Sequence, residues 1–113
     1  MPLLNIKTNI KVTTDHNQLM LSVSRRVAAI LDKSKNYVMV SLEDQCDLMF
    51  AGTHEPAAYL ELKSINLPEA DTAQLSSSLC GFIHERLEID PSRIYIEFSN
   101  AERHMWGWNG RVF

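Results

Sequence analysis

The residue directly behind the initiator methionine is the first that could do chemistry. Pro2 opens the stretch MPLLNIKT, in which a strand-like apolar run follows the proline at once. Methionine aminopeptidases generally remove Met1 when the next residue is as small as proline, and the secondary amine of Pro2 would then begin the chain. Burial against apolar walls lowers the pKa of such an amine from about 8 toward neutrality, which suits a general base. The simpler alternative is that Pro2 only starts a strand, where its missing N–H costs nothing.

The cysteines, glycines and histidines show no pattern of a second catalytic or ligand-binding site. Two cysteines, Cys46 and Cys80, lie far apart without a CxxC pair, which fits buried small side chains in a reducing compartment. The glycines form no phosphate-binding loop. The histidines are dispersed and show no metal-ligand spacing: His16, His54, His84 and His104. We therefore expect neither a metal nor a cofactor.

Size and charge exclude several classes of partner. The 113 residues, 45% of them hydrophobic, suit one domain over residues 1–113. Eleven basic and 14 acidic residues give a net charge of −3, and the longest basic run is Arg25-Arg26, which argues against nucleic acid. No stretch approaches the roughly 20 apolar residues that span a bilayer, and no signal peptide is recognisable. We expect a soluble, cytoplasmic protein without a membrane partner.

The elements that must position Pro2 are readable from the hydrophobic pattern. Residues 3–10 alternate between apolar and polar side chains, as in a half-buried strand. Residues 16–31 carry apolar side chains at helical spacing, and Thr13, Thr14 and Asp15 are candidate N-caps. After a polar break, residues 37–43 are rich in strand-forming types.

The same order of elements then recurs. A second strand, helix and strand are expected over residues 57–65, 69–89 and 92–100, so that pseudo-repeats span about 1–50 and 58–100. Two such units predict an α/β (α+β) fold, in which right-handed β-α-β crossovers place two helices on one face of a four-stranded mixed sheet. In the last strand Ile94, Ile96 and Phe98 share one side while Tyr95 and Glu97 share the other, so neither side suits full exposure, and we expect oligomerisation to cover the face without helices.

The two ends of the chain carry a family resemblance. MPLLNIKTN resembles the N-terminal strand of the macrophage migration inhibitory factor family, within the tautomerase superfamily, and SLCGFIHERLEIDPSRIYIEF resembles its second helix and strand. The GWN at residues 107–109 extends the match, which covers nearly the whole chain. The resemblance implies a homotrimer whose sheets line a central barrel, with active sites at subunit boundaries and residues 101–113 at the interface.

The resemblance also implies an activity and a set of site residues. Family members interconvert keto and enol forms of phenylpyruvate-like 2-oxo acids, and Pro2 matches their proton-carrying proline. Lys33 matches the lysine that holds the substrate carboxylate, although it could equally serve the helix dipole. Ile65, after Ser64, matches the residue whose backbone N–H also meets that carboxylate, although ordinary strand pairing is an alternative.

Aromatic residues match the far end of the family's pocket. Tyr95 matches a tyrosine contributed by the neighbouring subunit, and as a lone strand residue it could instead only pack. Trp108 sits where the family commonly has an aromatic pocket residue, and Trp106 stands where it more often has a smaller aliphatic one. Both tryptophans could line the pocket or pack at a subunit interface, and the sequence leaves the two roles open.

Two positions depart from the vertebrate members of the family. Glu97 stands where they carry asparagine, and an ionised carboxylate cannot donate a hydrogen bond. In the pocket its charge would raise the pKa of a Pro2 amine and disfavour anionic substrates, which suggests a weaker or differently selective tautomerase. Ala57 and Leu60 replace a CxxC pair, so thiol-disulfide chemistry is not expected.

The sequence thus favours a cofactor-independent keto-enol tautomerase acting on small aromatic 2-oxo acids. The main alternative is a cytokine-like trimer that binds a protein receptor, with leaderless secretion and little or no turnover, because a fold alone does not settle function. A third reading keeps Pro2 but hydrates or decarboxylates unsaturated acids. Glu97 keeps that reading open, while no arginine pair in the pocket segments favours it.

Overall fold

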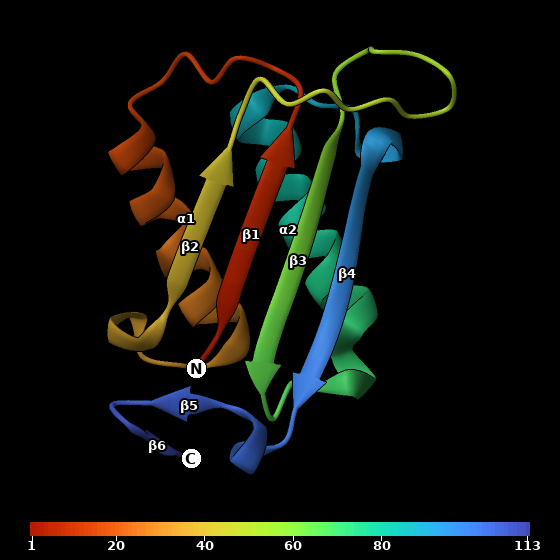
Figure 1. The fold of residues 1–113 in the computed structure, drawn as a ribbon. Helices are drawn as coiled ribbons and strands as arrows, with labels where there is room; N and C mark the ends of the chain where they lie inside the picture. Colours follow the sequence, from red (N-terminus) through yellow and green to blue (C-terminus); the bar gives the residue numbers. More distant parts are fainter.

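The computed structural model describes all residues 1–113 and contains two long helices, four long strands and a small terminal hairpin. Two consecutive strand-helix-strand units account for the long elements (Figure 1). In chain order these are β1 (Leu3–Thr8), α1 (His16–Leu31), β2 (Met39–Glu43), β3 (Ala58–Ile65), α2 (Thr72–Leu87) and β4 (Ile94–Ala101). The predicted order of elements is therefore confirmed.

The four long strands form one mixed sheet in the order β2-β1-β3-β4. Strands within each unit are parallel, because a helix carries the chain back to the same edge, while β1 and β3 meet antiparallel at the centre. This arrangement confirms the predicted fold class. The sheet of one chain is open at both edges and forms no closed barrel.

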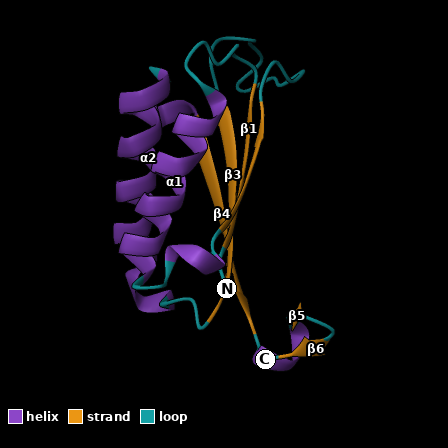
Figure 2. Cartoon of the chain, turned by 90° about the vertical axis from the view of Figure 1, so that its left-hand side faces the viewer, coloured by secondary structure: helices purple, strands orange, loops and turns teal.

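Both helices lie on the same face of the sheet (Figure 2). Alternate residues of the central strands point toward them and are fully buried, as Leu4 and Ile6 of β1 and Leu60 and Leu62 of β3 show. Apolar stripes of the helices pack onto these side chains in a single core of 18 buried residues. The N-terminal strand that carries Pro2 is therefore fixed in the middle of the molecule.

Local polar groups determine where the helices begin and end, and some of these ends differ from the predicted ones. Asp15, and neither threonine before it, caps α1 by accepting hydrogen bonds from the backbone N–H groups of Asn17 and Gln18. Residues 69–89 were predicted as one helix, but Glu69–Asp71 forms a separate 3-10 turn and Glu88 ends α2 in a left-handed conformation.

The strands are likewise shorter than the sequence predicts. β1 was expected to reach residue 10 but ends at Thr8, whose hydroxyl donates to the carbonyl of Ala57 at 2.8 Å. β2 begins at Met39 because residues Lys35–Tyr37 first form a 3-10 turn, which Ser34 caps. This turn places Tyr37 beside the start of the chain, where it lines a cavity.

The face of the sheet away from the helices is largely polar. Lys7 forms an ion pair with Glu43 of β2, and Lys63 forms one with Glu61 on β3. Tyr95 and Glu97 of β4 lie on this face and are exposed, as predicted for one side of that strand. In the isolated chain this face therefore has few apolar groups that require cover, apart from Tyr95 and Met39 at 64% and 67% exposure.

A short hairpin follows the sheet and lies beyond the end that holds both termini (Figures 1 and 2). Its strands are β5 (Gly107–Trp108) and β6 (Arg111–Val112), which pair antiparallel. Asn109 and Gly110 form the connection with φ of 54° and 73°, the left-handed pair that a tight two-residue hairpin turn requires. The hairpin places Trp108 and Phe113 next to the N-terminus.

Candidate active site

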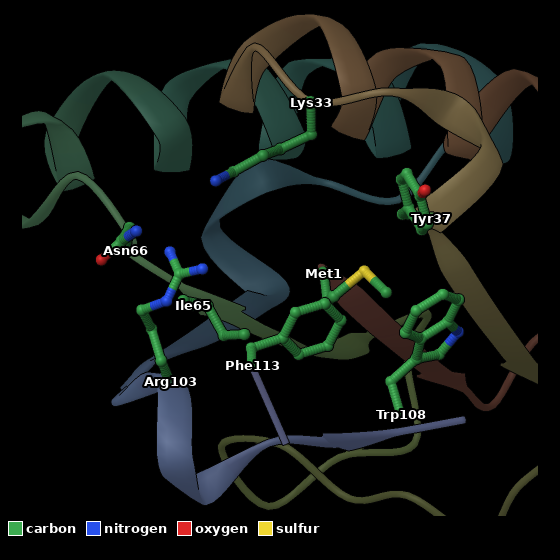
Figure 3. A pocket seen from close by; sticks show the side chains of 8 residues that line it. All are labelled: Met1, Lys33, Tyr37, Ile65, Asn66, Arg103, Trp108 and Phe113. Carbon is green, nitrogen blue, oxygen red and sulfur yellow. The ribbon is translucent and has the colours of Figure 1, made fainter. Parts of the chain in front are cut away.

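A cavity of about 290 Å³ opens beside the first residue of the chain (Figure 3). It lies where the end of β3, the segment after α1, the turn after β4 and the terminal hairpin meet. Its walls combine aromatic, basic and amide side chains: Met1, Lys33, Tyr37, Ile65, Asn66, Arg103, Trp108 and Phe113. A second hollow of about 280 Å³ adjoins it, since Met1, Tyr37 and Trp108 line both.

Pro2 is buried and lies against the second hollow. Its carbonyl accepts a hydrogen bond of 3.0 Å from the backbone N–H of Met39, which fixes the start of β1 against β2. With Met1 attached, the Pro2 nitrogen is an amide without a basic lone pair. Removal of Met1 would take away a wall that the two hollows share and would free the Pro2 amine beside the second hollow.

The cavity changes the pKa of the amine at the start of the chain. Burial and then the Lys33 ammonium lower the pKa of the Met1 amine below its ordinary value of 8.0. Both causes act on any amine at the start of β1, because desolvation and a nearby cation both disfavour the charged form.

Lys33 is held by the end of α1. Asp32 adopts the left-handed conformation with φ of 51°, and the backbone N–H of Lys33 donates to the carbonyl of Ala28 at 2.9 Å. This turn directs the half-buried Lys33 side chain into the cavity (Figure 3). The same position, just past the helix end, also suits the helix dipole, so the two roles proposed for Lys33 are compatible.

Ile65 and Ser64 end β3, but only Ile65 lines the cavity. Ser64 is fully buried on the helix side, where its hydroxyl donates to the carbonyl of Ile65 at 2.9 Å. The Ser64 side chain therefore supports the backbone at the cavity wall and does not itself face the cavity.

The two tryptophans come from the terminal hairpin and the turn before it. Trp108 lines both hollows, with its ring edge-on to Tyr37 at 6.1 Å and stacked on Phe113 at 5.7 Å between ring centroids. Trp106 lines only the second hollow, next to Pro2. Within one chain Trp108 therefore both lines the hollows and packs against aromatic rings, whereas Trp106 lines the second hollow.

Tyr95 and Glu97 lie elsewhere in the same chain. Tyr95 packs edge-on against Phe50 at 4.9 Å and lines an apolar hollow at the opposite end of the sheet. Glu97 accepts a hydrogen bond of 2.5 Å from the Tyr59 hydroxyl, and this bond is the main cause that raises the pKa of Tyr59 to about 12. One chain thus gathers Pro2, Lys33, Ile65 and the tryptophans at one end and leaves Tyr95 and Glu97 away from them.

Comparison with known proteins decides the family. A sequence model of the family described as macrophage migration inhibitory factor (MIF) matches residues 1–113. The chain belongs to the MIF family. It is 34% identical to a MIF homologue of Trichinella spiralis, and the match covers all of both chains. It is 29% identical to MIF of Mus musculus, and that match covers all of this chain and 99% of the mouse protein.

Solved structures of MIF proteins share the fold. The MIF homologue from Prochlorococcus marinus is 38% identical with a TM-score of 0.92, and 98% of each chain is covered. The structure of MIF from Trichinella spiralis has a TM-score of 0.93 at 33% identity, covering 98% of this chain and 99% of that one. The similarity to MIF proteins therefore includes the terminal hairpin as well as the sheet and helices.

The MIF resemblance in the sequence did not identify several residues that line the cavity. Tyr37, Asn66, Arg103 and Phe113 come from turns and the chain end, where no hydrophobic period marks a position. Asn66 has φ of 53°, a conformation that asparagine tolerates better than most residues, and this is the one local signal that could have marked it. No group of three or more His, Cys, Asp or Glu side chains could hold a metal ion, and neither helix is long and apolar enough to cross a membrane.

Proposed function

We propose that this MIF-family chain is a cofactor-independent keto-enol tautomerase of phenylpyruvate-like 2-oxo acids, with Pro2 as general acid and base once Met1 is removed. One observation carries the proposal: the amine at the start of the chain, which is that of Met1 in this structure, lies at a cavity where burial and Lys33 lower its pKa. A lowered pKa increases the share of free base at a given pH, which favours an amine that both accepts and returns a proton. Family membership supports a tautomerase-like or cytokine-like role in general.

The proposed reaction moves one proton and consumes no other reagent. The Pro2 nitrogen takes a proton from the carbon next to the 2-oxo group, and the electrons of that C–H bond form the enol double bond. The C=O π electrons move to the oxygen, to which the Pro2 ammonium returns the proton directly or through water. In the reverse direction the Pro2 ammonium protonates the same carbon while the enol oxygen loses its proton. Catalysis therefore depends on position and on the pKa of the amine.

The cavity supplies the groups that would hold such a substrate. The Lys33 ammonium points into it and can bind the carboxylate, together with the backbone N–H of Ile65. Tyr37 and Trp108 offer flat apolar walls for the aromatic ring. A carboxylate held at Lys33 would place the neighbouring 2-oxo group close to the start of β1, where the Pro2 amine lies.

The proposal includes a homotrimer, because Tyr95 and Glu97 do not reach the Pro2 cavity of their own chain. A neighbouring copy would bring these two residues to the site, with residues 101–113 at the boundary between subunits. Glu97 would then add a negative charge that stabilises the protonated amine and opposes the effect of Lys33. A cytoplasmic location completes the proposal.

The decisive experiment combines intact-mass measurement with tautomerisation of enol phenylpyruvate. We expect the purified protein to lack Met1 and to be active, and we expect Pro2→Ala to lose most of kcat/KM while remaining folded. Pro56→Ala is a matched control, because Pro56 is exposed in the loop before β3. A processed but inactive protein would overturn the proposal and favour a binding role, as would full activity in Pro2→Ala.

A further inference from the structure

Two basic side chains meet at one side of the cavity without a protein partner. Figure 3 shows the Lys33 ammonium and the Arg103 guanidinium directed toward the same side, beside Asn66, while Tyr37 and Trp108 stand at the other. None of the four ion pairs in the structure involves either cation, and neither head group makes a hydrogen bond to the protein. Unpaired cations that converge on a cavity are a binding arrangement for anions.

Asp32, directly before Lys33, is exposed and does not line the cavity, and two further acidic side chains near the cavity have partners of their own. Glu102, directly before Arg103, pairs with His104 at 3.4 Å, and Glu69 accepts a hydrogen bond from the Asn100 amide at 3.0 Å. No Asp or Glu lines the cavity. A substrate with one carboxylate would neutralise only one of the two cations, so the residues of one chain leave an excess of positive charge, which a Glu97 brought by a neighbouring copy would reduce.

The two cations differ in what they recognise. Lys33 is a compact point charge, whereas the guanidinium of Arg103 presents a planar fork that matches both oxygens of a carboxylate. Arg103 begins the 3-10 turn Arg103–Met105 that follows β4, and the backbone N–H of Trp106 donates to its carbonyl at 3.3 Å. The turn therefore holds the Arg103 backbone on the cavity rim, opposite the helix end that carries Lys33 (Figure 3).

We propose that Arg103 is a specificity-determining residue that binds a second carboxylate, so that the site accepts compact 2-oxo dicarboxylic acids as well as aromatic 2-oxo acids. The proposal rests on the proposed tautomerase function for its reaction, with Lys33 holding the carboxylate next to the 2-oxo group. The cavity of about 290 Å³, with Met1 still present, has room for a compact diacid between the two cations.

The test compares a dianionic with a monoanionic substrate on protein whose mass shows that Met1 is gone. The enol forms of oxaloacetate and phenylpyruvate are the probes, and kcat and KM are measured for wild type, Arg103→Gln, Arg103→Lys and Arg25→Gln. Arg25 is a matched control, because it is exposed on α1 and lines neither of the two hollows beside the N-terminus. Thermal unfolding of each variant verifies that it is folded.

We expect Arg103→Gln to lower kcat/KM for enol oxaloacetate about tenfold more than for enol phenylpyruvate, mainly through KM, because a charge-assisted bond to the second carboxylate is lost. Arg103→Lys should recover part of this difference, and Arg25→Gln should match wild type. Equal losses on the two substrates, no loss on either, or turnover of phenylpyruvate alone by wild type would each overturn the inference.

Failure of the proposed tautomerase function is recognised separately. If processed wild type turns over neither enol, equilibrium binding of succinate and butyrate is measured by calorimetry on wild type and Arg103→Gln. Preferential binding of succinate that disappears in Arg103→Gln would still support the second carboxylate site. Equal affinity for the diacid and the monoacid in wild type would overturn it.

Discussion

Replacing Lys33 with methionine tests the electrostatics of the cavity most directly. Methionine keeps the unbranched apolar stem of the half-buried lysine and removes only its charge. A hydrogen bond between a charged donor and a carboxylate contributes about 1.5–3 kcal/mol, so the loss should weaken binding of enol phenylpyruvate by roughly 10- to 150-fold. We expect most of this effect in KM, because the carboxylate is bound alike in the ground and transition states.

The same substitution should also shift the pH dependence in a defined direction. The Lys33 ammonium favours the neutral form of the chain amine and is one cause of the lowered pKa of that amine. Removing the ammonium therefore raises the pKa of the amine, so that more of it is protonated at a given pH. In the pH profile of kcat/KM, the rise that reports deprotonation of the amine should therefore move to higher pH in Lys33→Met.

The assay is the pH profile of kcat and KM for enol phenylpyruvate with wild type, Lys33→Met and Lys35→Met. Lys35 is the matched control, because it is exposed in the adjacent 3-10 turn and lines neither hollow. An unchanged KM in Lys33→Met, or a rise that moves to lower pH, would refute the reasoning. Equal effects in the two variants would point to a nonspecific change in surface charge.

Two further predictions concern the pair formed by Tyr59 and Glu97. Glu97→Asn should raise kcat/KM for enol phenylpyruvate, because a negative charge that stabilises the protonated Pro2 amine is removed; steady-state kinetics would contradict this with no change or a loss. The hydrogen bond to Glu97 raises the pKa of Tyr59 to about 12, so Glu97→Gln should let this phenol titrate at lower pH. Ultraviolet titration, with Tyr59→Phe subtracted, checks the second prediction, and a Tyr59 that titrates near 10 in wild type would argue against it.

The fold was predictable because its signals are periodic. The helical spacing from Leu19 to Leu31 and the alternation in β1 reflect burial against one core, so pattern and structure agree. The boundaries were less predictable, because they depend on single contacts such as the Thr8 hydroxyl on the Ala57 carbonyl. A periodic pattern does not encode where one side chain finds a distant backbone acceptor.

Part of the candidate site was predicted from the family resemblance and not from the pattern of elements. The resemblance implies Pro2, Lys33 and Ile65 as site residues, and the structure places Lys33 and Ile65 on the first cavity and Pro2 on the adjoining hollow. Arg103 could not be found in this way, because it lies in a turn whose direction is set by the terminal hairpin. Charge in a turn is usually solvated, and only the folded arrangement shows that this one faces a cavity.

The register of the sheet shows why a single chain leaves the proposed site incomplete. Leu3 pairs with Lys63 and Tyr95 pairs with Tyr59, so Pro2 and Tyr95 differ by five residues along β3, about 16 Å at 3.3 Å per residue, and lie two strands apart. A side chain cannot span that distance, and the same geometry holds Glu97 away from Pro2. If Glu97→Asn alters catalysis at Pro2, the effect must therefore cross a subunit boundary or act through long-range charge. High salt separates these two routes, because at about 1 M it screens exposed charges that lie more than about 3 Å apart but leaves a buried contact largely intact.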